Sequence, residues 1–150
     1  MNFYTISTFR EMVATLTKKP REGYVSLVDD ICNELQSMPI NIIRDTNERI
    51  IQESEYRVVK LRVGNSGQKL SKSNGFRLVY FVSLCTDDVV LLTVFPKRGA
   101  KGVSNILSTE YSRLLKELLN EIKAHKLHKV DIANHLTELR QDAALSTTES

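Results

Sequence analysis

The sequence predicts one α+β domain built on a small, largely antiparallel sheet of three to four strands. Three apolar, strand-like runs follow one another between residues 56 and 95, separated by polar segments. Two helical patterns precede these runs, and further helical patterns follow them. With 150 residues, 41% of them hydrophobic and 26% charged, the chain can bury one good core. We therefore expect two N-terminal helices and C-terminal helices to flank the sheet.

The N-terminal third carries one short strand pattern and two helical patterns. Residues 3–6 (FYTI) are typical of a strand, and Thr8 is a plausible cap for the first helix. A second helix is expected from about residue 22 to residue 36, because apolar residues recur there at helical spacing and Pro39 follows. Residues 40–53 fit either a connector or a short edge strand.

The first central run has one apolar face and one cationic face. In residues 56–63 (YRVVKLRV), apolar side chains alternate with Lys60 and Arg62. One face of this strand should enter the core, and the other should carry the two cations about 7 Å apart, two residues of strand rise.

The second and third runs predict a central strand and its neighbour. Residues 75–82 (GFRLVYFV) are apolar on both faces apart from Arg77, as expected for a strand covered on both sides. Residues 89–95 end at Pro96, which cannot donate a hydrogen bond to a strand ladder. Lys97 and Arg98 should therefore emerge where the third strand ends.

Basic charge is concentrated in this part of the chain. Residues 56–102 hold nine Lys/Arg and two Asp/Glu, a local charge of +7, which leaves −4 for the rest of a chain whose total is +3. The loop of residues 64–74 adds Lys69 and Lys72, and its Gly/Ser content predicts mobility in the free protein. Such a cluster favours a polyanionic partner, although a solvated sheet edge protected by lysines would give the same pattern.

The C-terminal part is expected to be helical. Ser104 or Ser108 can cap a helix that carries a long apolar stripe. Residues 1–124 then form the main domain, and residues 125–150 form a helical extension with a second amphipathic helix. Its end, residues 143–150, is expected to be disordered.

Three motifs follow one another on the central runs: Lys60-Leu61-Arg62, then residues 72–80 (KSNGFRLVY), then an apolar strand closing on Lys97-Arg98. In this order they resemble RelE/HigB-type toxins of bacterial type II toxin–antitoxin systems. The second motif is similar to the Lys-Ser-Gly-Gly-aromatic-Arg-Val-Ile-Tyr signature of the HigB-like branch. The resemblance covers roughly residues 50–120.

The resemblance implies a metal-independent, ribosome-dependent endoribonuclease that cleaves mRNA in the ribosomal A site and inhibits translation. It also implies a cognate antitoxin protein as partner and no cofactor. The expected catalytic residues are Lys60, Arg77, Lys97 and Arg98, and the residues expected to bind RNA are Arg62, Lys69, Lys72 and Lys101.

The chemistry of these residues is consistent with that reading. No histidine or carboxylate pair occurs in the basic runs, so lysine and arginine would have to do the work. Arginine can brace phosphate oxygens but stays protonated, whereas Lys60, crowded by Arg62, is the candidate base. Val58 stands where related toxins carry another lysine. No Tyr or His follows Lys97 closely, and the nearest phenol, Tyr111, is interpreted as a core residue.

Two other classes of function stay open. One is a ParE-like or inactive relative that binds protein or nucleic acid without cleaving RNA. The other is a small basic RNA-binding module, which would expose stacking aromatic side chains beside the cations, and only Tyr56 fits that description.

The remaining motifs predict no metal site and no membrane segment. Cys32 and Cys85 are interpreted as reduced core thiols, and His125, His128 and His135 as solvated histidines rather than metal ligands. No apolar run reaches the length of a membrane span, and we expect a cytoplasmic protein of unspecified oligomeric state.

Overall fold

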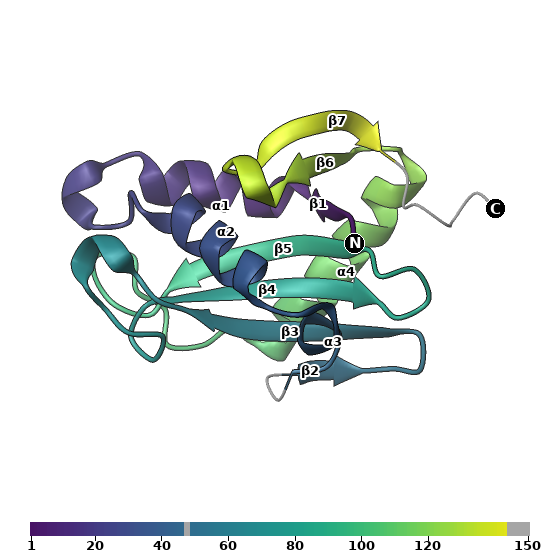
Figure 1. The fold of residues 1–150 in the computed structure, drawn as a ribbon, viewed down its shortest axis with the longest axis horizontal. Coiled ribbons are helices and arrows are strands. Elements are labelled where there is room, and N and C mark those ends of the chain that lie inside the picture. The colour runs from purple at the N-terminus through teal and green to yellow at the C-terminus, as the bar shows by residue number, and fades with distance from the viewer. Residues whose placement is uncertain (47–48, 144–150) are drawn as a thin grey trace.

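The computed structural model describes residues 1–46 and 49–143 and shows an α+β fold around one mixed sheet of seven strands (Figure 1). The strands are β1 (Phe3–Thr5), β2 (Arg49–Gln52), β3 (Tyr56–Val63), β4 (Phe76–Ser83), β5 (Val89–Pro96), β6 (Leu127–Asp131) and β7 (Thr137–Ala143). Their order across the sheet is β2-β3-β4-β5-β1-β6-β7. All neighbouring strands are antiparallel except β1 and β5, which are parallel.

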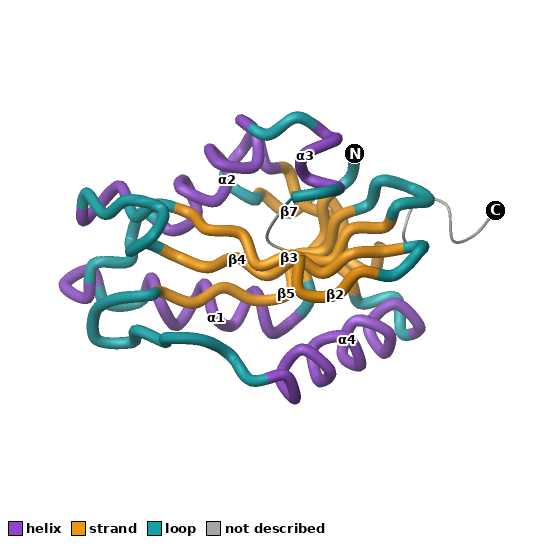
Figure 2. The backbone as a smooth tube through the Cα atoms, turned by 90° about the horizontal axis from the view of Figure 1, so that it is seen from below, coloured by secondary structure: helices purple, strands orange, loops and turns teal. Residues whose placement is uncertain are grey.

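Helices cover both faces of the sheet. They are α1 (Ser7–Thr17), α2 (Leu27–Ser37), α3 (Ile40–Arg44) and α4 (Ser108–Lys123). Helices α2 and α3 lie on one side of the strands and α4 lies on the other, while α1 continues from β1 and runs beside β5 (Figures 1 and 2). Two apolar clusters fill the layers: Leu27, Ile31 and Leu35 pack with Val59 and Leu61, and Leu114 and Leu118 pack with Val58 and Val79.

The three central runs form the strands that the sequence predicts. In β3, Val59, Leu61 and Val63 enter the core on the α2 side. Strand β4 is buried along most of its length, as expected for a strand covered on both faces. Tyr80 on β4 also donates a hydrogen bond to the carbonyl of Ile43 (2.8 Å), which attaches α3 to the sheet.

The prediction of three to four strands is wrong, because strands are added at both sides of the central group. Residues 40–53 contain both a short helix, α3, and an edge strand, β2. On the other side, β1 pairs with β5 through one edge and with β6 through the other. A three-residue strand gives little sequence signal, yet it joins two parts of the sheet.

The prediction of a helical C-terminal extension is also wrong for the described residues. β6 pairs with β1, with Val130 opposite Phe3, and β7 pairs with β6. The spacing of Ile132, Leu136 and Leu139 imitates a helix, but a 3-10 turn at Ile132–Asn134 separates two strands. The segment thus completes the sheet. Ala143 is the last residue of β7, and the rest of the expected disordered end lies outside the described residues.

Helix boundaries differ from the predicted caps. The second helix begins at Leu27 because Pro20–Glu22 form a 3-10 turn that ends at Gly23, whose φ of 89° favours glycine. Ile6, not Thr8, stands at the N-cap of α1, and Leu107 precedes α4 without a side-chain cap.

The cysteines are free, but only one is in the core. Cys32 is buried, and burial raises the pKa of its thiol to about 11. Cys85 is exposed, so its assignment to the core is wrong. Among the described helices, none combines the length and the apolar character needed to cross a bilayer.

Candidate functional site

Four of the predicted cations share one face of the sheet. Arg62 lies directly opposite Arg77 in the β3–β4 register, and Lys60 lies two residues before Arg62 on the same face. The amide of Lys97 donates to the carbonyl of Gly75 (2.8 Å), which continues the β4–β5 ladder and puts Lys97 two residues past the partner of Arg77. We call Lys60, Arg62, Arg77 and Lys97 the basic strip. It lies on the face that α4 covers farther along the strands.

The two arginines of the basic strip have different surroundings. Arg62 is exposed, whereas Arg77 is only 6% exposed. The guanidinium of Arg77 donates to the carbonyls of Lys72 (2.9 Å), Phe76 (3.2 Å) and Ser73 (3.0 Å). Like charges directly opposite on neighbouring strands are unfavourable, and these carbonyls offset part of that cost. Arg77 therefore holds the end of the loop between β3 and β4, and it also carries charge.

The two lysines of the basic strip contact the connection between β5 and α4. Lys60 Nζ donates to Asn105 Oδ1 (3.0 Å), and Lys97 Nζ donates to the carbonyl of Ser104 (2.8 Å). The amide of Val103 donates to the carbonyl of Pro96 (2.8 Å), which folds the connection back toward the strand end. In this arrangement both lysines are hydrogen-bond donors. A lysine held in this way can brace or protonate an oxygen when it is charged, and can act as a base when it is neutral.

Two lysines predicted to bind RNA form ion pairs with acidic residues. Lys72 pairs with Glu34 on α2 (2.9 Å), and Lys101 pairs with Glu22 (2.5 Å). The hydrogen bond from Lys101 holds the pKa of Glu22 below its usual value. Neither ion pair involves the basic strip.

The last two predicted residues lie in loops. Arg98 is exposed, and its Nε and Nη2 both donate to Asn74 Oδ1 (3.1 and 2.9 Å), which joins the two loops at this end of the sheet. Lys69 is exposed at a left-handed backbone position with a φ of 55°. The structure thus gathers four of the eight predicted residues on one face and distributes the others around it.

A polar hub that the sequence did not reveal positions these loops. Asn65 is 2% exposed, and its Nδ2 donates to the carbonyl of Gly23 (2.9 Å). Its Oδ1 accepts a hydrogen bond from the amide of Gln68 (3.3 Å). Ser26 Oγ lies within hydrogen-bonding distance of Asp30 on α2 (2.7 Å) and of Asn65 Oδ1 (3.0 Å), and its single proton is available to either acceptor. The loop after β3 is therefore attached to the start of α2.

Tyr24 holds the second loop in the same way. Its hydroxyl donates to the carbonyl of Arg98 (2.9 Å) and accepts from the amide of Lys101 (2.9 Å). A Cβ on Gly99 would lie 2.5 Å from this hydroxyl, and the φ of Gly99 is 92°, so glycine is required. More than seventy residues separate Tyr24 from these partners, which is why sequence patterns do not find the contact.

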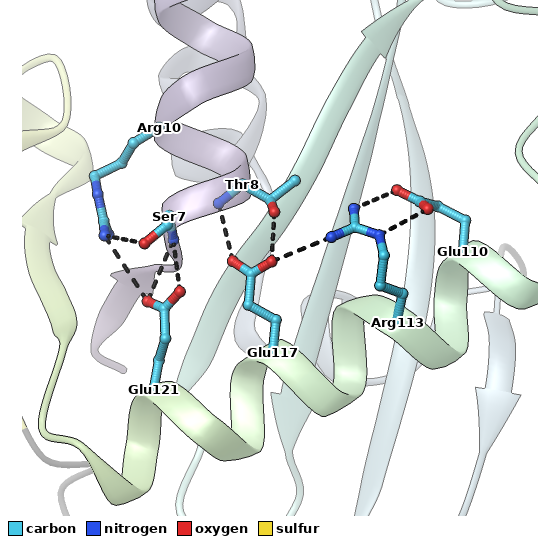
Figure 3. A network of polar contacts seen from close by, with 7 residues as sticks. All are labelled: Ser7, Thr8, Arg10, Glu110, Arg113, Glu117 and Glu121. Atoms are coloured by element: carbon cyan, nitrogen blue, oxygen red, sulfur yellow. Dashed lines mark hydrogen bonds and ion pairs between the residues drawn. The ribbon is translucent and has the colours of Figure 1, made fainter.

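A second polar network joins α1 to α4 (Figure 3). The amide of Ser7 donates to Glu121 (3.1 Å), and the amide and hydroxyl of Thr8 donate to Glu117 (3.0 and 2.5 Å). Two carboxylates of α4 thus cap the first turn of α1. Burial raises the pKa of Glu121, and the neighbouring Glu117 adds to the shift. Burial also opposes ionisation of Glu117, but hydrogen bonds from Thr8 outweigh it and lower that pKa.

Aromatic residues near the basic strip are packed in the core. Tyr56 is half-buried and stacks on Phe81, with ring centroids 5.2 Å apart. Tyr111 is 8% exposed, and its hydroxyl has no hydrogen-bond partner among the described residues. Burial raises the pKa of that phenol. Its packing in the cluster under α4 agrees with the core role assigned to it.

Within residues 1–46 and 49–143, no group of three or more His, Cys, Asp and Glu side chains comes together as a metal site would require. Comparisons with protein-family models, with curated proteins and with solved structures found no match to this chain. Functional assignment therefore depends on the site itself.

Proposed function

We propose that this protein is the toxin of a toxin–antitoxin system and acts as a metal-independent endoribonuclease on mRNA bound to ribosomes in the cytoplasm. The observation that supports this most is the cross-strand pairing of Arg62 and Arg77 between Lys60 and Lys97 on one sheet face. Placing like charges side by side is unfavourable in the free protein. A phosphate lying across them would convert that repulsion into charge-assisted hydrogen bonds.

The arrangement suggests a role for each cation. Arg62, which is exposed, would bind a phosphate oxygen first, and Arg77, directly opposite it, would stabilise the charged intermediate. Lys60 and Lys97 would exchange their contacts with Asn105 and Ser104 for phosphate oxygens, and one of them would protonate the leaving 5′-oxygen.

Lys60 remains the candidate base. Arginine stays protonated, so the arginines of the basic strip would brace the phosphate and not accept a proton. Lys60, two residues from Arg62 on the same face, would take the proton of the attacking 2′-hydroxyl, and Lys97 would then protonate the leaving 5′-oxygen.

A second function has its own support. The guanidinium of Arg77 is buried, and Lys60 and Lys97 already have acceptors in the β5–α4 connection. A ParE-like or inactive protein that binds protein or nucleic acid without cleaving RNA needs no more than such a fixed surface. The half-buried, stacked Tyr56 gives less support to a module that binds RNA by base stacking.

Cleavage of mRNA on programmed ribosomes separates these functions. We expect the wild-type protein to cut mRNA in the A site and Arg62→Ala to reduce the rate at saturating protein. Lys116→Ala, an exposed lysine of α4, is the matched control and should leave the rate unchanged. Binding without cleavage by the wild type, on or off ribosomes, would favour the second function.

The toxin proposal also requires a cognate antitoxin. We expect expression of this chain alone to arrest growth, and co-expression of an acidic partner that covers the basic strip to restore it. Normal growth at high expression, with no partner encoded nearby that binds the chain, would remove most of the support for a toxin.

A further inference from the structure

A cavity of about 240 Å³ lies between α1, α2 and the β6–β7 hairpin. None of the residues of the basic strip lines it. Its floor is made by Thr5, Phe9 and Val130, which are 2%, 2% and 7% exposed. Its walls are the half-buried side chains of Val13, Val28 and Leu136. A mostly apolar cavity of this size fits a molecule smaller than a typical drug.

A cation with weak ionic compensation borders this cavity. Arg10 Nη1 donates to the carbonyl and hydroxyl of Thr5 (2.8 and 2.9 Å), and Nη2 donates to Ser7 Oγ (3.1 Å), all neutral acceptors. Among the described residues, Glu121 is the one carboxylate within 4 Å, at 3.8 Å. That carboxylate also accepts from the amide of Ser7. Burial lowers the pKa of Arg10, although Glu121, Glu138, Glu117 and Glu11 act in the opposite direction. Glu138 also lines the cavity, and a closer anion would offset the desolvation cost that remains.

Two oriented imidazoles complete the rim. His128 Nδ1 lies 3.2 Å from Glu138, and His135 Nδ1 lies 2.6 Å from Asp29. A carboxylate at Nδ1 fixes the ring and leaves Nε2 for another partner. His135 and Leu136 both have left-handed backbone conformations, with φ of 55° and 60°. Such strain in successive non-glycine residues is typical of ligand clamps.

We propose that this cavity binds a small aliphatic or aromatic carboxylate. The carboxylate would accept hydrogen bonds from Arg10, and the apolar part would lie against Val13 and Leu136. The proposal concerns a site apart from the basic strip and is independent of RNA cleavage.

Titration with hexanoate and with hexan-1-ol, followed by amide NMR and calorimetry, tests the proposal. The two probes share an apolar chain and differ in the charged head. We expect saturable shifts in α1 and β6, with hexanoate binding about tenfold tighter or more, the gain of a charge-assisted hydrogen bond. Arg10→Gln should reduce hexanoate binding to the level of the alcohol. Arg113→Gln, the same change on α4, should leave the preference intact.

A second variant keeps the test decisive if Arg10→Gln folds poorly. Val13→Phe fills the cavity and keeps the cation, so it should abolish binding of both probes while circular dichroism stays native. Equal affinity for hexanoate and hexan-1-ol would show an apolar crevice only and overturn the proposal. Absence of saturable shifts in the wild type, or unchanged binding in Val13→Phe, would overturn it as well.

Discussion

Two polar networks fix distant segments of this protein, and they use different chemistry. At the loop end of the sheet, the amide of Asn65 and the hydroxyl of Ser26 connect the loop after β3 to α2. At the junction of α1 and α4, the carboxylates of Glu117 and Glu121 receive the first amides of α1. The first network supports the basic strip, and the second holds two helices together.

The two networks differ in the electrostatic repulsion that each one has to offset. The loop end is centred on an uncharged amide, Asn65, which needs only its hydrogen bonds to be complete, and its carboxylate, Asp30, accepts from Ser26 and from the amide of Ser66. Two carboxylates one helical turn apart repel each other, and they are retained because each receives backbone amides at a helix N-terminus. We therefore expect the loop end to set the geometry of the site, and the helix junction to respond to pH.

The largest effect should come from breaking the link between the basic strip and its loop. If Arg77 braces the reacting phosphate, Arg77→Ala should slow RNA cleavage about 100-fold or more, as loss of a preorganised donor does. Arg77→Lys keeps the charge but loses the planar fork, so it should recover little of the rate. The measurement is cleavage on programmed ribosomes at saturating protein.

Lys69→Ala is the matched control for Arg77. It removes one exposed loop charge, so it should weaken RNA binding and reduce its salt dependence by about one charge without changing the saturated rate. Circular dichroism checks that both variants fold. Equal losses for Arg77 and Lys69 would indicate a diffuse electrostatic surface rather than positioned groups.

Removal of the hub should have the next largest effect, on stability. Asn65→Ala leaves the carbonyl of Gly23 without its donor in a buried site and removes an acceptor of Ser26 and Gln68, and should cost about 2 kcal/mol of unfolding free energy. Asn74→Ala removes an amide whose hydrogen-bond partner among residues 1–46 and 49–143 is the exposed Arg98, and should cost less than about 0.5 kcal/mol. Urea denaturation measures both, and similar losses would show that Asn65 is not a hub.

The helix junction should contribute less. Glu117→Ala removes the acceptor of the amide and hydroxyl of Thr8, and should cost about 1 kcal/mol, the usual value of a lost N-cap. Glu110→Ala is the control, because Glu110 pairs with exposed Arg113 and caps nothing. We expect it to change the unfolding free energy by less than about 0.5 kcal/mol. A larger loss for Glu110 would contradict the capping role.

The sequence predicts the centre of this fold well, for local reasons. Alternation of Lys60 and Arg62 with apolar residues gives the two faces of β3, and the two-sided apolar pattern identifies β4 as central. These signals depend on neighbouring residues alone. The same local pattern puts Lys60 and Arg62 on one face of β3, and the strand register adds Arg77, opposite Arg62, to that face.

The parts that sequence reasoning missed depend on contacts between distant residues. The prediction for residues 127–143 failed because pairing with the three-residue β1 decides their structure. Thr8 was expected to cap α1 with its own side chain. Instead, the amide of Thr8 donates to Glu117, which lies 109 residues away in the sequence. The ion pairs of Lys72 with Glu34 and of Lys101 with Glu22 are likewise invisible in local patterns.

The smallest effect should be a pH dependence that separates the two carboxylates of the junction. Glu121 has a raised pKa in the folded protein, so it binds its proton more tightly folded than unfolded. That stabilisation is fully present below the ordinary glutamate pKa of about 4.3 and is lost as pH rises through the folded pKa. Relative to Glu121→Gln, the wild type should therefore lose stability on going from acid to neutral pH, by less than about 1 kcal/mol.

Glu117 should show the opposite sign. Its folded pKa is lowered, so its stabilisation is present above the ordinary value and is lost as pH falls through the folded pKa. Urea denaturation of the wild type, Glu117→Gln and Glu121→Gln between about pH 3 and pH 7 brackets both transitions. The two difference curves should slope in opposite directions, because folding lowers the pKa of Glu117 and raises the pKa of Glu121. Difference curves with the same slope would contradict the opposite pKa shifts of Glu117 and Glu121.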